Sequence, residues 1–519
     1  MTAAVLPASR RVTRLRTAGL MPALLALVVG TAAWYAATPY VVGVFHDDGV
    51  YALLAKAIAE GRGFHYLQLP GAPAATHYPP LYPLLLGLLW WISPAFPENL
   101  SFLLAANAAC LAASALGLYA FARRRLDWEM APAVAVSLVA HLSVPILTLS
   151  NALLSESLFL ALLWPSLLLA EWVVTSRHAT SGQVIGAGVA AATLMLCRTI
   201  AVALVLAVLL LLAQRGRWRH VAHFSLASGA ALLPWTLWTL VAAPAVPAPL
   251  SGAYGSYGSF AAAGAHAGGF RLLGSTVAIN LREVALTMAD RIAPGLPGAL
   301  ALPALLVFVV AIVAGAWQLA HRAPVTLAFV AAYLGIVLVT AFTPWRYLFA
   351  LWPLLLVIAA AGARRVVIQS RSRRMAPLAM GLLAVPAAGL LLTESRALSH
   401  RAWQQPAANA TRQVAPLVEW VRASTLPADV VLAEGAEVIT LFTGRRAAPP
   451  VEFAAADYVR SPDGARTQAS LLAMLRAVPA TYLVTFSPSV IAAARSGLMS
   501  PRLLEAGRFP GGVAFRVVR

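Results

Sequence analysis

Two adjacent carboxylates follow the first apolar run of this 519-residue sequence and are its most conspicuous candidates for chemistry. Asp47 and Asp48 are preceded by His46, and Tyr51 stands three positions after the second acid. A carboxylate in such a position can act as general base on an acceptor hydroxyl or amine. Asp47 could instead cap the helix predicted from DGVYALLAKAIAEG, because Asp suits the N-cap position. Two neighbouring acids leave one free for chemistry even if the other caps.

Further ionisable and aromatic side chains stand at the ends of other apolar runs. Such groups are costly near membrane depth and usually mark function. Arginines hold phosphate oxygens and stabilise the charge that develops on a leaving group, so together with a carboxylate they suit group transfer from a lipid-linked phosphate. A divalent metal site that combines the carboxylates with His77 or Glu156 is a second possibility, and Arg198 alone could be a snorkelling charge. The set comprises His77, Tyr78, Glu156, Arg198, Arg346 and Tyr347.

The composition indicates a polytopic membrane protein. Hydrophobic residues make up 60% of the chain and charged residues only 11%, whereas soluble domains carry about 25% charged residues. Apolar runs near 20 residues recur, and each can cross a hydrocarbon core about 30 Å thick. The net charge of +19 comes from arginines clustered at the ends of these runs, which is typical of the positive-inside bias and of contact with lipid headgroups rather than of nucleic-acid binding.

Placing the arginine clusters inside predicts about eleven spans, with the N-terminus cytoplasmic and the C-terminus outside. Residues 45–98 then form one long outer loop, in which Leu81–Ile92 is expected to be a helix at the outer interface, or alternatively a short span. A second long outer loop covers residues 244–298, irregular to Phe270 and helical to about Arg291. The predicted spans are Leu20–Val44, Leu100–Ala122, Ala131–Leu149, Ser157–Thr175, Gly182–Arg198, Ile200–Ala213, Val221–Val241, Leu300–Leu319, Pro324–Phe342, Tyr347–Ala361 and Ala376–Leu392.

The composition changes after the last span, and residues 396–519 read as a small extracytoplasmic α/β domain. Helical periodicity is present at 411–424 and 471–478. Residues 429–435 (DVVLAEG) read as a buried strand followed by a turn, and further strands are predicted at 480–486 and 511–518. Alternating helices and strands favour this class of fold. We find no glycine-rich phosphate loop, metal cluster or nucleophile motif in this part, so an outer cap is the expected role.

The first outer loop resembles that of the GT-C membrane glycosyltransferases, which include protein O-mannosyltransferases and lipid A aminoarabinose transferases. The likeness rests on HDDGVYALLAKAIAEGRG followed by HYPPLYPLLLGLLWW. Asp47 and Asp48 match the family's acidic pair, Tyr51 its tyrosine, and Pro79-Pro80-Leu81 its Pro-Pro-Leu segment. The sequence departs from the pattern at Asp48, where many relatives have Glu, and at His77, where several have Lys. Similar later positions are Glu156 in LSES, Arg198 in CRTIA, and Arg346 with Tyr347 in WRYLF.

The resemblance implies a GT-C-like all-α membrane domain over residues 1–395 and an inverting hexosyl- or pentosyltransferase in the cytoplasmic (inner) membrane. It implies a polyprenyl-phosphate sugar as donor and an acceptor at the outer face, whose identity stays open. Asp47 would be the catalytic carboxylate with Asp48 beside it, and Arg346, Arg198 and Tyr347 would bind the donor phosphate. A transporter or flippase of a lipid-linked or anionic substrate is the alternative, but we detect no internal repeat. A scaffold without catalysis should tolerate replacement of Asp47 and the arginines.

Overall fold

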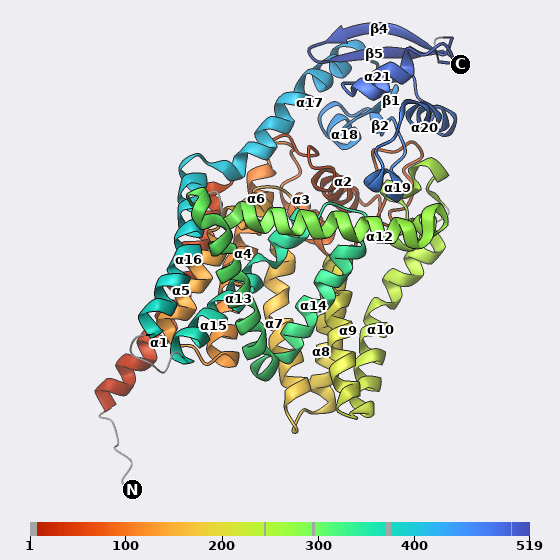
Figure 1. The fold of residues 1–519 in the computed structure, drawn as a ribbon. Helices are drawn as coiled ribbons and strands as arrows, with labels where there is room; N and C mark the ends of the chain where they lie inside the picture. The colour runs from red at the N-terminus through yellow and green to blue at the C-terminus, as the bar shows by residue number, and fades with distance from the viewer. Residues whose placement is uncertain (1–7, 243–244, 293–295, 370–374, 500, 519) are drawn as a thin grey trace.

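The computed structural model of the chain describes residues 8–242, 245–292, 296–369, 375–499 and 501–518. Helices dominate it, and a small sheet lies at the C-terminal end (Figure 1). The helices of the bundle are α1 (Ala8–Ala36), α4 (Leu100–Arg125), α5 (Met130–His141), α6 (Val144–Ser150), α7 (Glu156–Thr175), α8 (Ser181–Cys197), α9 (Val202–Gln214), α10 (Trp218–Ala242), α13 (Gly298–Arg322), α14 (Pro324–Val339), α15 (Trp345–Gln369) and α16 (Met375–Ser399).

Every predicted span falls on a helix or a bent pair of helices, which makes the chain a multi-pass membrane protein. Among the described residues, six helices are long and apolar enough to cross a bilayer, and α5 with α6 forms a further candidate span bent by 56°. The remaining four predicted spans correspond to shorter apolar helices. The first span is corrected, because α1 ends at Ala36 and not near Val44. The third is broken where Pro145 opens a new helix, since proline fits the first turn of a helix but not its interior.

The second outer loop differs from its prediction. Residues 244 and 293–295 lie outside the described residues, but helix α12 begins already at Tyr257 and runs to Ile292, with a kink at Gly269. A short 3-10 turn (Ala248–Leu250) and helix α11 (Ser251–Tyr254) precede it. In Figure 1, α12 lies across one end of the bundle, steeply inclined to α7, α8 and α9. That end, next to the C-terminal sheet, is called the sheet end below.

Helices α2 (Asp47–Ala59) and α3 (Leu81–Ile92) also lie at the sheet end and pack against each other. Helix α3 is only 12 residues long, and its Trp91 is exposed while Trp90 is buried. Figure 1 shows α3 at the sheet end. Its place at the outer interface of the membrane, with a short span as the alternative, stays a prediction.

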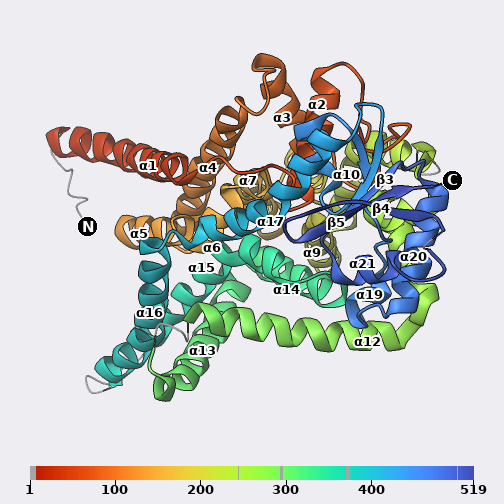
Figure 2. The ribbon, with the colours of Figure 1, turned by 90° about the horizontal axis from the view of Figure 1, so that it is seen from above.

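The predicted C-terminal α/β unit is a five-stranded sheet in the order β2-β1-β3-β5-β4. Strands β1 (Val430–Ala433), β2 (Arg446–Ala448) and β3 (Tyr482–Thr485) are parallel, while β5 (Gly512–Val517) runs antiparallel to β3 and to β4 (Leu503–Phe509). Helix α17 (Gln405–Ser424) leads from the bundle to this sheet (Figure 2). Residues 425–499 and 501–518, called the sheet region below, also contain α18 (Ala436–Thr443), α19 (Ala455–Val459), α20 (Gly464–Ala477) and α21 (Pro488–Ala494).

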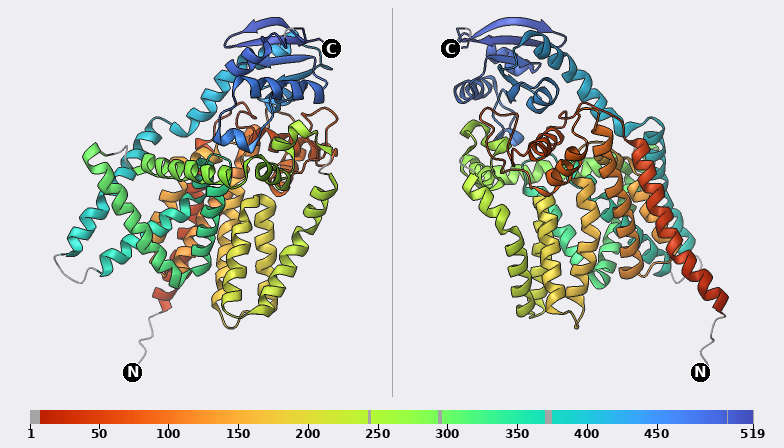
Figure 3. Two further views of the ribbon diagram at one scale, coloured as in Figure 1. Left: turned by 45° about the vertical axis from the view of Figure 1, so that its right-hand side comes forward. Right: turned by 180° about the vertical axis from the view of Figure 1, so that it is seen from behind.

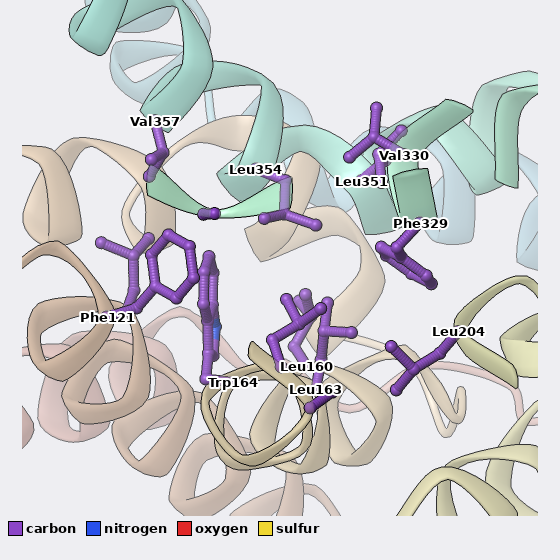
Figure 4. Close-up of a cluster of buried hydrophobic side chains, with 14 of the residues drawn as sticks. Phe121, Leu160, Leu163, Trp164, Leu204, Phe329, Val330, Leu351, Leu354 and Val357 are labelled. Atoms are coloured by element: carbon purple, nitrogen blue, oxygen red, sulfur yellow. The ribbon is translucent and has the colours of Figure 1, made fainter. Parts of the chain in front are cut away.

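Two large apolar cores stabilise this arrangement. One lies inside the bundle, where Phe121, Trp164 and Phe329 are fully buried together with Leu160 and Leu351 (Figure 4). Between membrane-spanning helices such packing stabilises the bundle through van der Waals contacts rather than through removal of apolar surface from water. The other core is continuous from the first loop into the sheet region, so the two parts share one packed interior instead of touching at a wet surface.

Candidate active site

A cavity of about 760 Å3 lies at the sheet end, and eight of the ten predicted site residues line it. Its floor is formed by the ends of bundle helices at the sheet end and by the first loop, and its opposite wall belongs to the sheet region. Asp48 and Glu156 do not line the cavity but lie behind residues that do. The eight lining residues are His46, Asp47, Tyr51, His77, Tyr78, Arg198, Arg346 and Tyr347.

Asp47 is the first residue of α2 and does not cap the helix, so the capping alternative is wrong. Its carboxylate accepts a hydrogen bond from the Tyr78 hydroxyl at 2.9 Å and one from Arg346 Nη1 at 2.6 Å. Burial is the largest single influence and raises the pKa of Asp47, but Arg346, His46 and the Tyr78 hydroxyl together outweigh it and lower that pKa to about 2. Asp47 is therefore a charged carboxylate with a fixed orientation, still 28% exposed to the cavity.

The two arginines are held by one buried carboxylate. Glu156 stands in the first turn of α7 and is fully buried. Its Oε1 atom accepts from Arg198 Nη1 at 2.8 Å and from Arg346 Nη2 at 2.9 Å. A buried carboxylate of this kind needs such partners, because an unpaired buried charge is very unfavourable. The result is a continuous chain from Asp47 through Arg346 and Glu156 to Arg198, with no net formal charge.

Aromatic and hydroxyl groups fix the arginine end of the cavity. The Arg198 guanidinium lies 5.8 Å from the centroid of the Tyr347 ring, within cation–π range, and donates to Ser155 Oγ at 3.1 Å. The Tyr51 hydroxyl lies 3.1 Å from the same Ser155 oxygen, and its ring packs edge-on against Tyr78. Both tyrosines therefore connect the acidic and the basic parts of the site.

Asp48 points away from the cavity and stabilises the turn that precedes Asp47. Its oxygens accept the backbone N–H groups of Gly43 at 2.8 Å and Phe45 at 3.0 Å. The side chain is fully buried, and burial raises the pKa of Asp48 to about 6. His46, between turn and helix, has a φ of 64°, which is uncommon for a residue other than glycine. The geometry thus separates the adjacent acids into one that faces the cavity and one that shapes the loop.

The two predicted histidines differ in charge. His46 Nδ1 lies 3.2 Å from Glu437, a nearly fully buried residue of α18. Burial is the largest single influence and lowers the pKa of His46, but the carboxylates of Glu437, Asp47 and Asp48 together outweigh it and raise that pKa to about 9. His77 Nδ1 donates to the Gly255 carbonyl at 2.7 Å, and burial lowers the pKa of His77 to about 4. His77 is therefore a neutral imidazole near neutral pH.

Helix α18 packs tightly against the first loop through two glycines. A Cβ atom on Gly43 would lie 2.8 Å from the Val438 side chain, and one on Gly49 would overlap Glu437. Gly43 also has a φ of +106°, which disfavours any other residue. The first loop and α18 therefore interlock, and the position of Asp47 depends on the sheet region.

Sequence reasoning missed the cavity wall that the sheet region provides. No motif pointed to it, although Glu434 directly follows a strand that had been predicted. Polar groups at the carboxyl end of a buried parallel strand are a recognisable signal for a ligand site. The wall also contains Glu452, Asp457, Arg466, Ser487 and Ser489.

The described residues contain no group of three or more His, Cys, Asp or Glu side chains arranged to hold a metal ion. The two side chains considered as further ligands are engaged elsewhere, Glu156 by two arginines and His77 by a backbone carbonyl.

Comparison with known proteins finds relatives by structure alone, since no protein-family model and no curated protein sequence matches. ArnT from Cupriavidus metallidurans in the apo state aligns with a TM-score of 0.56 at 12% identity, over 97% of this chain and 98% of that one. The same protein bound to undecaprenyl phosphate aligns with a TM-score of 0.54 at 12% identity, over 96% of this chain and 98% of that one. The Archaeoglobus fulgidus oligosaccharyltransferase tethered with an acceptor peptide aligns with a TM-score of 0.52 at 11% identity, over 96% of this chain and 74% of that one. These are GT-C proteins, so the resemblance is confirmed at the level of the fold.

Proposed function

We propose, on the premise of this GT-C fold, that the chain is a membrane glycosyltransferase that moves a sugar from a polyprenyl-phosphate donor to an acceptor at the outer face of the cytoplasmic membrane. The observation that carries the proposal is the cavity in which Asp47 and two arginines form one hydrogen-bonded chain. One of the structures that share the fold holds undecaprenyl phosphate. In the proposed topology the N-terminus is cytoplasmic and the sheet region is outside.

The arginines suit the donor phosphate. Arg346 is the second residue of α15 and Arg198 directly follows α8, so both stand at helix ends, where a lipid headgroup would meet the protein. A guanidinium holds two phosphate oxygens at once, and a water-poor cavity strengthens this attraction as negative charge develops on the leaving group. Tyr347 covers Arg198 and restricts where the phosphate can bind.

Asp47 suits the role of general base, and donor binding would activate it. In the free protein, Arg346 and its neighbours keep the pKa of Asp47 at about 2, so the Asp47 carboxylate is a weak base. A phosphate that takes hydrogen bonds from Arg346 adds negative charge nearby and raises that pKa. Asp47 then accepts the proton from the O–H or N–H group of the acceptor, while the oxygen or nitrogen of that group bonds to the anomeric carbon of the donor sugar. The bond from the anomeric carbon to the phosphate oxygen breaks, and the phosphate leaves with the electron pair.

One displacement of this kind inverts the anomeric configuration, whereas retention needs a second carboxylate as nucleophile. Among the described residues, the other two carboxylates next to Asp47 are unsuited to that task. Asp48 points into the loop, and Glu156 lies behind the arginines. The transporter alternative has no comparable support, because the polar residues gather at one end of the bundle rather than near its middle.

The test is turnover of a panel of radiolabelled polyprenyl-phosphate sugars by the purified protein in nanodiscs, followed as loss of label from the lipid. We compare wild type with Asp47→Asn and with Asp127→Asn, a matched change at an 89%-exposed carboxylate. Wild type and Asp127→Asn should release the sugar, and Asp47→Asn should be slower by about a hundredfold or more. Wild-type rates in Asp47→Asn would refute the role of Asp47. If the wild-type protein binds neither any of the donors nor undecaprenyl phosphate, the proposed function is refuted.

A further inference from the structure

The sheet region contributes a polar patch to the cavity that the mechanism above does not use. Glu434 directly follows β1, and Ser487 and Ser489 follow β3, so all three stand at the carboxyl ends of neighbouring parallel strands. All three line the cavity that also contains Asp47. Figure 3 shows the sheet region lying over the sheet end of the bundle.

The connections of the sheet mark this place as a ligand crevice. From β1 the chain passes through α18 to β2 on one side, and it later returns to β3 on the other side of β1. The order of the strands therefore reverses between β1 and β3. In open α/β sheets, ligands bind outside the carboxyl ends of the strands at such a switch point. The topology and the cavity thus identify the same residues independently.

The side chains of this crevice are arranged to bind hydroxyl groups. The Glu434 carboxylate is oriented by the Thr485 hydroxyl at 2.6 Å and the Phe486 backbone N–H at 3.3 Å. Each carboxylate oxygen can accept more than one hydrogen bond. The Ser487 and Ser489 hydroxyls lie 2.9 Å apart and are exposed, so they offer both donors and acceptors.

The charge of this wall differs from that of the arginine end. Besides Glu434 it contains Glu452 and Asp457, and its one arginine, Arg466, already lies 3.4 Å from Asp457. An anionic ligand would meet carboxylates here, and like charges brought together are unfavourable. The crevice therefore favours an uncharged ligand rich in hydroxyl groups over a phosphate.

We propose that the crevice formed by Glu434, Ser487 and Ser489 is the acceptor subsite and binds an uncharged saccharide unit, not a phosphate-bearing acceptor. This inference rests on the proposed function, because it assigns the arginine end to the donor phosphate. In a single displacement the attacking atom approaches opposite the leaving group, so the acceptor must enter from the remaining wall of the cavity. The sheet region provides that wall.

The test measures binding without turnover, by saturation-transfer NMR on the full-length protein in nanodiscs. The probes are methyl glycosides of common neutral hexoses and, as the anionic counterpart, the corresponding hexose phosphates. The double variant Ser487→Ala/Ser489→Ala removes two exposed hydroxyls and should leave the fold intact. Glu434→Gln is the second variant, and Glu505→Gln on β4, outside the cavity, is the matched control.

We expect at least one neutral glycoside to bind to wild type and to Glu505→Gln, and to bind about tenfold more weakly to both crevice variants. Hexose phosphates should bind more weakly than their neutral counterparts. Equal binding by wild type and both crevice variants, no binding of any neutral glycoside, or a preference for the phosphates would overturn the inference. Binding of undecaprenyl phosphate is measured in parallel, because its loss would contradict the proposed donor site, whereas the crevice variants should leave it within about twofold.

Discussion

Arg346 cannot hold a donor phosphate fully while Nη1 is bonded to Asp47, so replacing Asp47 by Asn should have two opposite effects. Transfer should be lost together with the general base, and binding of undecaprenyl phosphate should become tighter. The gain arises because the phosphate no longer competes with a carboxylate for the guanidinium. In Asp47→Asn, the bound phosphate also no longer has a negatively charged side chain beside it.

The structure sets the size of this gain. The pKa of Asp47 lies at about 2 instead of 3.8, which corresponds to about 2.4 kcal/mol in favour of the charged carboxylate. This net value combines burial, which raises the pKa, with Arg346, His46 and Tyr78, which lower it, so it gives only the order of magnitude of the cost to a phosphate that takes over Arg346. The affinity of Asp47→Asn for undecaprenyl phosphate should therefore rise by about tenfold or more. Arg346→Gln, by contrast, removes a charge-assisted hydrogen bond and should weaken binding by about 1.5–3 kcal/mol.

The assay is titration calorimetry of undecaprenyl phosphate into nanodisc-embedded protein near neutral pH, as a double-mutant cycle. In the Arg346→Gln background, Asp47→Asn should give little further gain, because the competition has already been removed. Asp457→Asn is the matched control, since it removes a carboxylate from the same cavity but not from the arginine end. Unchanged or weaker binding by Asp47→Asn would refute the competition, and equal gains in both backgrounds would show that Arg346 does not mediate it.

Three other changes test the surroundings of the site. The raised pKa of His46 contributes stability that is fully present below about pH 6.5 and is lost as the pH rises through about 9. Thermal unfolding measured between pH 6 and 10 should show this loss in wild type and not in Glu437→Gln. Glu156→Gln leaves Arg198 without its counter-charge and Arg346 with Asp47 alone, so it should lower the free energy of unfolding by about 3–5 kcal/mol. An unchanged melting temperature and transfer rate would contradict this role. Gly49→Ala places a methyl group against Glu437 and should reduce both stability and transfer. Gly464→Ala, where nothing lies within 4 Å, should change stability by less than about 0.5 kcal/mol when measured by the same unfolding assay.

The overall class of fold was predictable because it depends on local signals. Long apolar runs cross membranes irrespective of their neighbours, and short apolar runs that alternate with helical segments indicate an α/β unit in the C-terminal part. The depth of the site residues was predictable for the same reason, since the arginine clusters fix which helix ends share a side. Arg198 and Arg346 could be assigned to one end of the bundle on this basis, and the structure brings both onto Glu156.

The parts that escaped prediction depend on contacts distant in sequence. Nothing local distinguishes Asp47 from Asp48. Their separation follows from where α2 begins and from the backbone N–H groups that Asp48 accepts. Strand β2 has only three residues and pairs with β1, so its sequence carries no alternation to read. The cavity wall around Glu434 could not be predicted from the sequence, because it becomes a wall only by facing a bundle built from other segments of the chain.

The interlock between the first loop and α18 has a consequence for the synthesis of the protein. The loop with Asp47 is translated early, but Glu437 and Val438, against which Gly49 and Gly43 pack, leave the ribosome only after the membrane helices. Domains generally fold in the order of their synthesis. Here the loop must wait for the chain to close over it, at an entropic cost that grows only slowly with the length of the intervening segment. A nascent chain that stops before α18 would thus contain every membrane helix and both arginines but not the sheet region that completes the cavity.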